Sequence, residues 1–227
     1  MVRWQGAKPP TGGLVLILMK LETNVYVDGF NLYYNCVKGT QYRWLNLSKL
    51  CTLLLPGHRI NRIRYFTSYV IPHPKDPQQL QRQLTYVRAL KTIPNLTVHR
   101  GQFMVHSVWR PLAQPPAADQ DMVQVLDTKE KGSDVNLASY LLVDGFNKEY
   151  EMAVVISSDS DLVEPIKLAN SHLGLPVGVL HPHRSHSVEL SKVAKFYRPI
   201  RERALRDSLF PPVLTDAAGT IIKPPTW

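Results

Sequence analysis

The chain of 227 residues contains few of the residues that mark several common protein classes. Its two cysteines, Cys36 and Cys51, form no Cys-x-x-Cys pair, which excludes a disulfide framework and a zinc ribbon. A reducing, cytoplasmic setting is therefore expected. The absence of a Gly-x-Gly-x-x-Gly segment argues against dinucleotide binding. The apolar run from Leu14 to Met19 is too short to span a membrane, so no membrane association is expected.

Acidic residues are outnumbered by basic ones, 18 against 27, which gives a formal net charge of +9. Such a charge favours a polyanionic partner such as nucleic acid. With 44% hydrophobic residues, the chain can bury one large α/β core. We expect a flexible arm or mis-assigned start at 1–21, with Met19 as an alternative first residue. One domain is expected at 22–200, followed by a basic, proline-rich tail at 201–227, in which residues 209–227 are expected to form no regular element.

The spacing of apolar residues predicts strands and helices that alternate along the chain. The predicted strands span 24–28, 60–70, 152–157 and 177–180, and 96–109 is predicted to be a longer strand or a hairpin arm. The predicted helices begin at Asn31 and span 47–55, 76–93, 133–146 and 161–171. The proline-rich stretch 111–121 is expected to project as a loop. This alternation implies a parallel, doubly wound sheet.

Three short acidic motifs lie where the predicted elements begin or end. They are Asp28-Gly29-Phe30-Asn31, Lys131-Gly132-Ser133-Asp134 and Ser158-Asp159-Ser160-Asp161. In open α/β sheets, ligands bind at the carboxyl ends of the strands. Two carboxylates about 4 Å apart would repel by about 4 kcal/mol at an effective dielectric of about 20. A divalent cation removes this repulsion, so the motifs predict a metal site.

At these motifs the chain resembles NYN domains, a branch of the PIN-like nucleases. Three blocks carry the resemblance, in the family's order and spacing: Tyr26-Val27-Asp28-Gly29-Phe30-Asn31, Glu130-Lys131-Gly132-Ser133-Asp134-Val135-Asn136-Leu137-Ala138 and Ile156-Ser157-Ser158-Asp159-Ser160-Asp161-Leu162. The resemblance spans residues 22–200. It implies a PIN-like three-layer α/β/α sandwich with a central, mainly parallel sheet. It also implies a ribonuclease site in which acidic residues bind Mg²⁺ or Mn²⁺.

The chemistry of phosphodiester hydrolysis suggests a role for each residue of the motifs. Magnesium ions can activate water, polarise the phosphorus centre and stabilise the leaving oxygen. Mg²⁺ takes only one or two carboxylates directly. We therefore expect Asp28 and Asp159 nearest the metal, and Asp134 and Asp161 orienting water or binding a second ion. The remaining candidates would position the phosphate or support the ligands: Asn31, Lys131, Ser158 and Ser160.

Structural roles remain open for most of these residues. Asp134 and Asp161 precede helices, where an aspartate N-cap contributes about 1 kcal/mol. Ser133 and Ser160 could cap those helices instead, which would free the aspartates for a metal. Asn31 could cap the first helix. Lys131 could simply be solvated.

The pentapeptide Val-Asp-Gly-Phe-Asn occurs twice, at residues 27–31 and 143–147. The first copy ends a predicted strand, whereas the second ends a predicted helix. We interpret the match as coincidence. Asp144 is then expected to be an exposed helix-end residue, and Gly145 a C-terminal cap.

Basic and aromatic residues supply candidate RNA contacts. The stretch 184–206 carries seven basic residues against two acidic ones, and Arg184, Lys192 and Lys195 are its candidate phosphate contacts. The three histidines just before or within this stretch favour a basic loop over a zinc site. They are His181, His183 and His186. Tyr33, Tyr34 and Trp44 could stack on unpaired bases, with burial in the core as the alternative.

The sequence thus predicts a metal-dependent endoribonuclease that acts on single-stranded or loop regions of RNA. An inactive PIN-like RNA-binding or interaction module is the alternative, against which the intact set of four aspartates argues. A phosphatase with an aspartyl nucleophile would have Asp-x-Asp directly after the first strand, where this chain has Asp28-Gly29-Phe30. A protein inhibitor or a second copy of the chain is a further candidate partner.

Overall fold

Six parallel strands form the centre of the structure, a computed structural model that describes residues 20–227 except 73, 115–120, 183, 185 and 226. The strands are β1 (Leu21–Asp28), β2 (His58–Thr67), β3 (Leu96–Arg100), β6 (Met152–Ile156), β7 (Val177–Pro182) and β8 (Tyr197–Ile200). Their order is β3-β2-β1-β6-β7-β8. The order therefore reverses between β1 and β6. Predictions for residues 1–19, including a start at Met19, lie outside the described residues.

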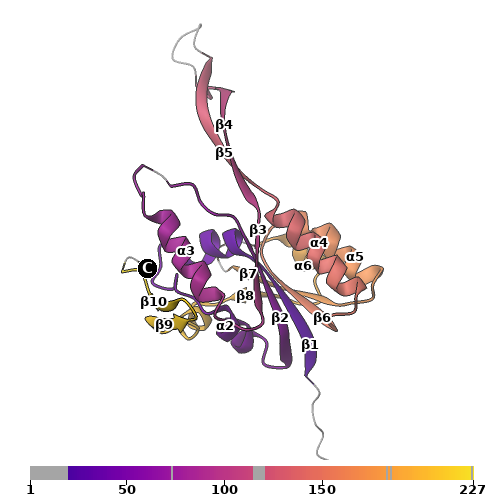
Figure 1. Ribbon diagram of the computed structural model, residues 1–227. Coiled ribbons are helices and arrows are strands. Elements are labelled where there is room, and N and C mark those ends of the chain that lie inside the picture. The colour runs from indigo at the N-terminus through magenta and orange to yellow at the C-terminus, as the bar shows by residue number, and fades with distance from the viewer. Residues whose placement is uncertain (1–19, 73, 115–120, 183, 185, 226) are drawn as a thin grey trace, which may run out of the picture.

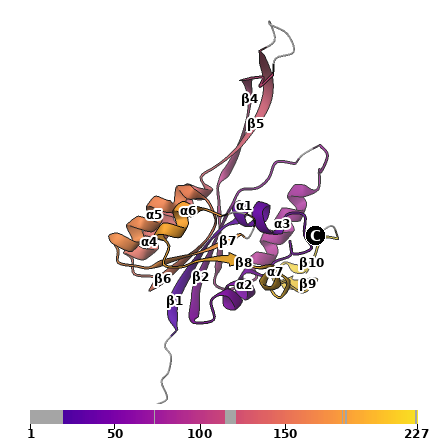
Figure 2. The ribbon, with the colours of Figure 1, turned by 180° about the vertical axis from the view of Figure 1, so that it is seen from behind.

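Helices cover both faces of this sheet, as Figures 1 and 2 show. One layer contains α1 (Gly29–Leu32), the π-helix η1 (Tyr33–Val37), α2 (Leu47–Leu54), α3 (Gln79–Leu90) and α7 (Glu202–Arg206). The other contains α4 (Ser133–Phe146), the 3₁₀ helix η2 (Ser160–Leu162), α5 (Val163–Ser171) and α6 (Val188–Val193). Val25 and Val27 pack in the first layer, whereas Tyr26 packs in the second. The predicted three-layer α/β/α sandwich is confirmed.

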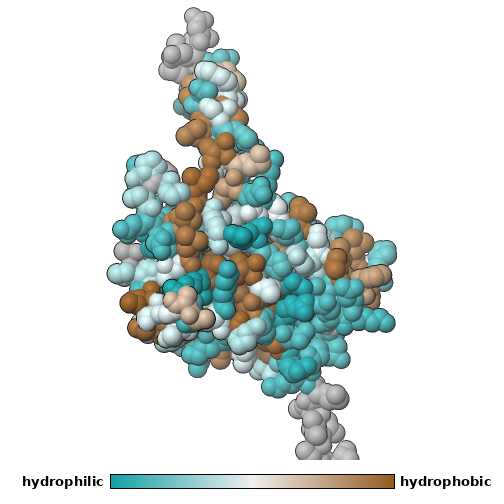
Figure 3. Space-filling view, viewed as in Figure 1, coloured by the Kyte–Doolittle hydropathy of each residue, from teal (hydrophilic) through white to brown (hydrophobic). Residues whose placement is uncertain are grey.

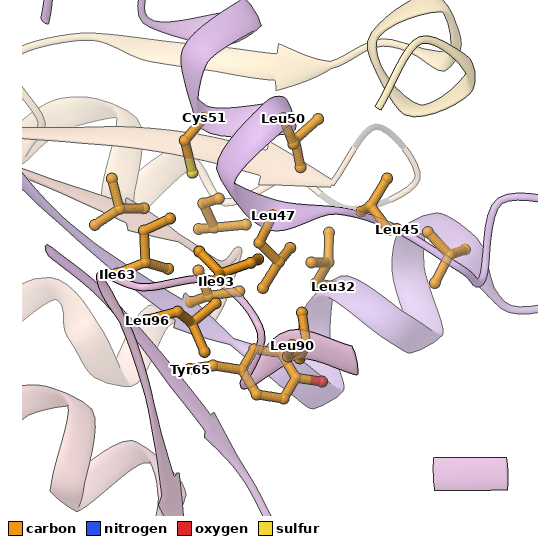
Figure 4. Packing of buried hydrophobic residues seen from close by; sticks show 14 of the residues in the cluster. Leu32, Leu45, Leu47, Leu50, Cys51, Ile63, Tyr65, Leu90, Ile93 and Leu96 are labelled. Atoms are coloured by element: carbon orange, nitrogen blue, oxygen red, sulfur yellow. The ribbon is translucent and has the colours of Figure 1, made fainter. Parts of the chain in front are cut away.

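The first layer is held by aliphatic side chains from helices and strands distant in the sequence. Figure 4 shows Leu47 and Leu50 of α2, Ile63 of β2 and Leu90 of α3 in one cluster of buried side chains. All four side chains are fully buried. Burial of such a side chain contributes about 1.5–3 kcal/mol relative to exposure. This packing holds the sheet under α1 and so supports the segment that follows β1.

A two-stranded hairpin projects from the sandwich (Figure 1). It consists of β4 (Gln102–Pro111) and β5 (Met122–Lys131), which pair antiparallel. The stretch 96–109, predicted as a longer strand or a hairpin arm, forms two strands: β3 ends at Arg100, and β4 is the first arm of the hairpin. Between them lies Gly101, where a Cβ atom would be 2.6 Å from the Lys131 carbonyl oxygen. Figure 3 shows apolar side chains along the hairpin, and Trp109 is 64% exposed. Of residues 111–121, predicted as a projecting loop, Pro111 ends β4 and the other described residues lie between the two strands; 115–120 are not described.

The tail at 201–227 contains regular elements, and the prediction that residues 209–227 form none is wrong. It forms α7 and the antiparallel strands β9 (Val213–Asp216) and β10 (Gly219–Ile222). Phe210 and Ile221 are buried in the first layer. Arg88 of α3 binds Asp216 through two hydrogen bonds of 2.8 and 2.6 Å. These elements have four or five residues each, too few for a periodic pattern to predict them.

No helix in the described part of the chain combines the length and apolarity needed to cross a membrane.

Candidate functional site

Asp28 is the last residue of β1 and lies where the strand order reverses. In open α/β sheets, this reversal creates a crevice at the carboxyl ends of the strands. The Asp28 side chain accepts a hydrogen bond from the backbone nitrogen of Asn31 (2.9 Å) and another from Ser157 Oγ (2.9 Å). Asp28 therefore caps α1. The alternative in which Asn31 caps this helix is wrong, because Asn31 lies inside it.

Asn31 connects the first acidic motif to the third. Its Oδ1 atom accepts hydrogen bonds from the backbone nitrogen of Ser158 (3.1 Å) and from Ser158 Oγ (2.9 Å). Ser157 and Ser158 directly follow β6, which pairs with β1. The two motifs, 127 residues apart in the sequence, are thus joined across the central crevice.

Asp159 caps the 3₁₀ helix η2 by accepting a hydrogen bond from the backbone nitrogen of Asp161 (3.0 Å). Its own backbone nitrogen donates to Ser157 Oγ (3.0 Å). Asp161 and Ser160 lie within η2 and are exposed. The alternative caps Ser160 and Asp161 are therefore wrong. Asp159 lies beside the Ser157 that binds Asp28.

Glu130 brings the second motif to the same edge. Its Oε1 atom accepts from Ser133 Oγ (2.8 Å), from the Ser133 backbone nitrogen (3.3 Å) and from Ser68 Oγ (2.6 Å). Glu130 thus satisfies the first turn of α4, and neither Ser133 nor Asp134 does so. Gly132 precedes the helix with φ of 97°, a left-handed value that favours glycine. The sequence analysis gave Glu130 no role, although it opens the second block of the family resemblance.

The four aspartates share one electrostatic environment. Burial raises the pKa of Asp28 to about 6, with its two hydrogen bonds lowering it and the charges of Asp134 and Asp159 raising it. Burial also raises the pKa of Asp134, as do the charges of Asp159, Glu130 and Asp161. The structure therefore brings all three acidic motifs together, as the sequence predicted.

The side chains of this site are hard oxygen ligands, which suit Mg²⁺ or Mn²⁺. Among the described residues, no three side chains of His, Cys, Asp or Glu are grouped so that they could ligate one ion together. Mg²⁺ commonly binds one or two carboxylates and keeps several waters. The donor set therefore fits an ion held by one or two aspartates, with the other acids binding its waters.

The basic candidates lie at different ends of the sheet. Lys131 is exposed at the base of the hairpin, beside Gln102. Arg184 Nη1 donates to the Lys38 carbonyl oxygen (3.3 Å), near the carboxyl end of β7. The backbone nitrogen of Lys195 donates to Val177 at the start of β7 (2.8 Å). Lys195 therefore lies at the end of the sheet opposite Asp28.

Lys192 also lies toward that opposite end, in the last turn of α6, and pairs with Glu189 (3.1 Å). The stretch 184–206 is therefore not one continuous basic face next to the aspartates.

The histidines near β7 stack on an aromatic ring. His181 is buried and lies parallel to the ring of Tyr197, with centroids 4.3 Å apart. His186 meets the same ring edge-on, at 5.1 Å. No zinc-binding group occurs among the described residues, and His183 lies outside them.

The second copy of the pentapeptide lies in α4, and both expectations for it are wrong. Asp144 is 2% exposed and accepts hydrogen bonds from Arg64 Nε and Nη2, both 2.7 Å, and from the Tyr26 hydroxyl, also 2.7 Å. Gly145 lies within the helix, where a Cβ atom would be 2.6 Å from the Tyr150 hydroxyl oxygen. Gly145 is thus required for close packing, and Asn147 is the C-cap.

Comparison with known proteins places this geometry in a family. A family model described as "NYN domain" matches residues 22–200. The chain is 28% identical over 236 residues to 6-hydroxy-3-succinoylpyridine 3-monooxygenase of Pseudomonas putida, covering 91% of this chain and 75% of that protein. A solved structure of a protein of unknown function from Vibrio parahaemolyticus has a TM-score of 0.53 and 17% identity. It covers 84% of this chain and 97% of its own, and it supports the fold alone.

The family model covers the six-stranded sheet and all three acidic motifs. Since it matches most of the chain, and the parallel α/β sandwich agrees with it, this protein belongs to the NYN domain family of PIN-like folds.

Proposed function

We propose that this protein is a metal-dependent endoribonuclease that cleaves single-stranded or loop regions of RNA. The observation that supports this most directly is the shared environment of Asp28 and Asp134. Both pKa values are raised by burial and by other carboxylates at the crevice between β1 and β6. A divalent cation would remove this repulsion and also bind a phosphate.

In this proposal Asp28 and Asp159 bind the ion directly, and Asp134 and Asp161 hold its waters. Bound Mg²⁺ or Mn²⁺ supplies Lewis acidity and an activated water for phosphodiester hydrolysis. The Asn31 amide, held by Ser158, keeps the segment after β1 in register with the segment after β6. It would position the scissile phosphate through its Nδ2 donors. Ser157 keeps Asp28 and Asp159 in a fixed relation.

Electrostatics favours RNA as the substrate. The net charge of +9 attracts a polyanion, and Lys131 and Arg184 lie at the carboxyl edge of the sheet where they can contact phosphates. Lys192 and Lys195 would act only on more distant phosphates, because they lie toward the other end of the sheet. Unpaired RNA enters a crevice more readily than a stacked duplex.

Cleavage of a labelled, partly single-stranded RNA in Mg²⁺ or Mn²⁺ tests the proposal. We expect Asp28→Asn or excess EDTA to reduce cleavage at least about 100-fold, because a direct ligand is lost. Asp207→Asn is the matched control, since Asp207 belongs to none of the three motifs and pairs with Arg203 and Arg206 at the end of α7. Circular dichroism checks the fold of each variant. Absence of cleavage by the wild type, with salt-sensitive RNA binding that persists in EDTA, would favour the inactive binding module.

A second candidate function is oxygenation of a pyridine, the activity in the name of the Pseudomonas putida relative. The observation that favours it is a pocket lined by tyrosine and phenylalanine rings beside the first acidic motif. Incubation with a hydroxypyridine, oxygen and a reduced nicotinamide donor, followed by mass spectrometry, tests it. A product heavier by one oxygen atom, formed by the protein and not by buffer, would support this function over the nuclease.

A further inference from the structure

A pocket of about 120 Å³ opens next to Asp28, on the side of the sheet covered by α1 and α3. It begins at Gly29 and Phe30, the two residues that follow Asp28, and reaches Thr67 at the carboxyl end of β2. An engineered apolar cavity of about 150 Å³ binds benzene. The pocket therefore has the size of a single six-membered ring.

Aromatic rings from four parts of the chain form its walls. They are Phe30, Tyr33, Tyr34, Tyr65, Tyr86 and Trp227. Tyr33 and Tyr34 come from the π-helix η1, and π-helical turns occur often at functional sites. Tyr65 and Tyr86 meet edge-to-face at 6.5 Å, and Tyr86 lies 5.3 Å from Trp227. The pocket is thus lined by aromatic rings, whose faces and edges can contact a bound ligand.

Tyr34 differs from the other walls because it is 47% exposed. Its ring stacks on Phe30 at 6.3 Å and meets Tyr33 edge-to-face at 5.2 Å. The Lys38 ammonium lies 4.5 Å from its centroid. A cation thus stands beside the exposed ring, where it can contact a phosphate attached to the occupant.

Polar side chains also line the pocket, and several are held in place. Gln83 Oε1 accepts from the Val70 backbone nitrogen (2.8 Å), while its Nε2 donates to the Ser68 carbonyl oxygen (2.8 Å). Arg82 pairs with Asp76. Arg43 Nε donates to the Thr40 carbonyl oxygen (3.2 Å). An apolar pocket with a few oriented polar groups is typical of a small-molecule or base site.

We propose that this pocket binds one six-membered nitrogen heteroaromatic ring, and that the ring is an unpaired base of the RNA held at the aspartates. This proposal rests on the proposed ribonuclease function and names how its substrate is held. The base would contact Tyr34 and Phe30, its attached phosphate would face Lys38, and the next phosphate would reach the crevice at Asp28. Base stacking on an aromatic side chain contributes about 1–3 kcal/mol.

The test is a double-mutant cycle on binding. An eight-nucleotide single-stranded RNA carries one abasic position, moved along the chain, and its affinity is measured by fluorescence anisotropy in EDTA, so that no cleavage is needed. Wild-type protein and Tyr34→Ala are compared. Trp109→Ala is the matched control, because Trp109 is also an exposed aromatic residue but lies on the projecting hairpin.

We expect an abasic change at one position of the RNA to weaken binding to the wild type by about five- to 100-fold. The same abasic change should not weaken binding to Tyr34→Ala. In Trp109→Ala, the abasic change at that position should still weaken RNA binding. Additive effects of Tyr34→Ala and the abasic change at every position would overturn the proposal, even if the protein cleaves RNA. If the double-mutant cycle gives the expected result but the protein cleaves no RNA, the pocket would still bind a base and the ribonuclease function would be rejected.

Calorimetric titration with a free hydroxypyridine distinguishes the other source of such a ring. Binding that is lost in Tyr34→Ala, together with RNA affinity that is insensitive to this change, would overturn the base assignment and identify the pocket as a small-molecule site.

Discussion

The two copies of Val-Asp-Gly-Phe-Asn share every letter, yet their aspartates lie in opposite electrostatic surroundings. Asp28 is buried with hydrogen-bond donors and other carboxylates around it, and its pKa rises to about 6. Asp144 is buried against the guanidinium of Arg64 and the hydroxyl of Tyr26. Burial lowers the pKa of Arg64, but the hydrogen bond and charge of Asp144 outweigh this effect, so the pKa is raised overall.

This difference separates a structural carboxylate from a candidate functional one. Asp144 has its counterion within the protein, so its charge stabilises the contact between α4 and β2. Asp28 is surrounded by acids, an arrangement that stabilises the fold poorly and suits an added cation. The position of the counterion, rather than the motif, decides the role.

The largest expected effect that sharpens this comparison is on stability. Asp144→Ala leaves the Arg64 guanidinium buried without its partner, so we expect the free energy of unfolding to fall by about 3–5 kcal/mol. Asp28→Asn should leave the free energy of unfolding unchanged or slightly higher at pH 7, because it removes a carboxylate that the charges of Asp134 and Asp159 repel. Urea unfolding of both variants measures the two values. Equal destabilisation by the two changes would contradict the assignment.

The next effect is the pH dependence of the metal-free protein. The pKa of Asp28 is about 6 in the folded state against 3.8 ordinarily, so the folded state binds the proton more tightly. This proton contributes up to about 3 kcal/mol to the free energy of unfolding. The contribution is fully present below a pH of about 4 and is lost as the pH rises through about 6.

Urea unfolding between pH 4 and 7 in EDTA measures this loss. Asp28→Asn should flatten the curve, and Mg²⁺ at pH 7 should restore stability in the wild type but not in the variant. A wild-type curve that is flat over this range would contradict the raised pKa.

The smallest effect concerns the phenylalanine of each copy. Phe30 contacts Phe103 at 5.6 Å and Tyr34 at 6.3 Å, and such ring pairs contribute about 0.5–1.5 kcal/mol each. We expect Phe30→Ala to cost about 1–3 kcal/mol. Phe146 is 77% exposed, so Phe146→Ala should change stability by less than about 0.5 kcal/mol. Thermal unfolding compares them, and a larger loss from Phe146→Ala would indicate an interface on α4.

Much of the sandwich could be predicted because its signals are local. The apolar run before Asp28 predicts β1, and the spacing of Leu137 and Leu141 predicts α4 with the bounds that the structure has. The short elements could not be predicted. The strands β8, β9 and β10 have four residues each, and β5 faces solvent for most of its length, so neither group produces a strong pattern.

The candidate site was predicted in part for the same reason. Motifs that end adjacent parallel strands must meet, so Asp28 and Asp159 could be placed together. The hydrogen bond from Ser68 to Glu130 spans 62 residues, and the position of Lys195 depends on the path of α6. Neither relation can be predicted from neighbouring residues in the sequence.

The sequence by itself determined the alternation of strands and helices, the family and the positions of the acidic motifs along the chain, because each depends on neighbouring residues. Only the tertiary structure decided which aspartate meets a cation. Arg64 lies 80 residues from Asp144 and reaches it because β2 packs beneath α4. Charges interact through space, so identical pentapeptides acquire different chemistry from the elements packed against them.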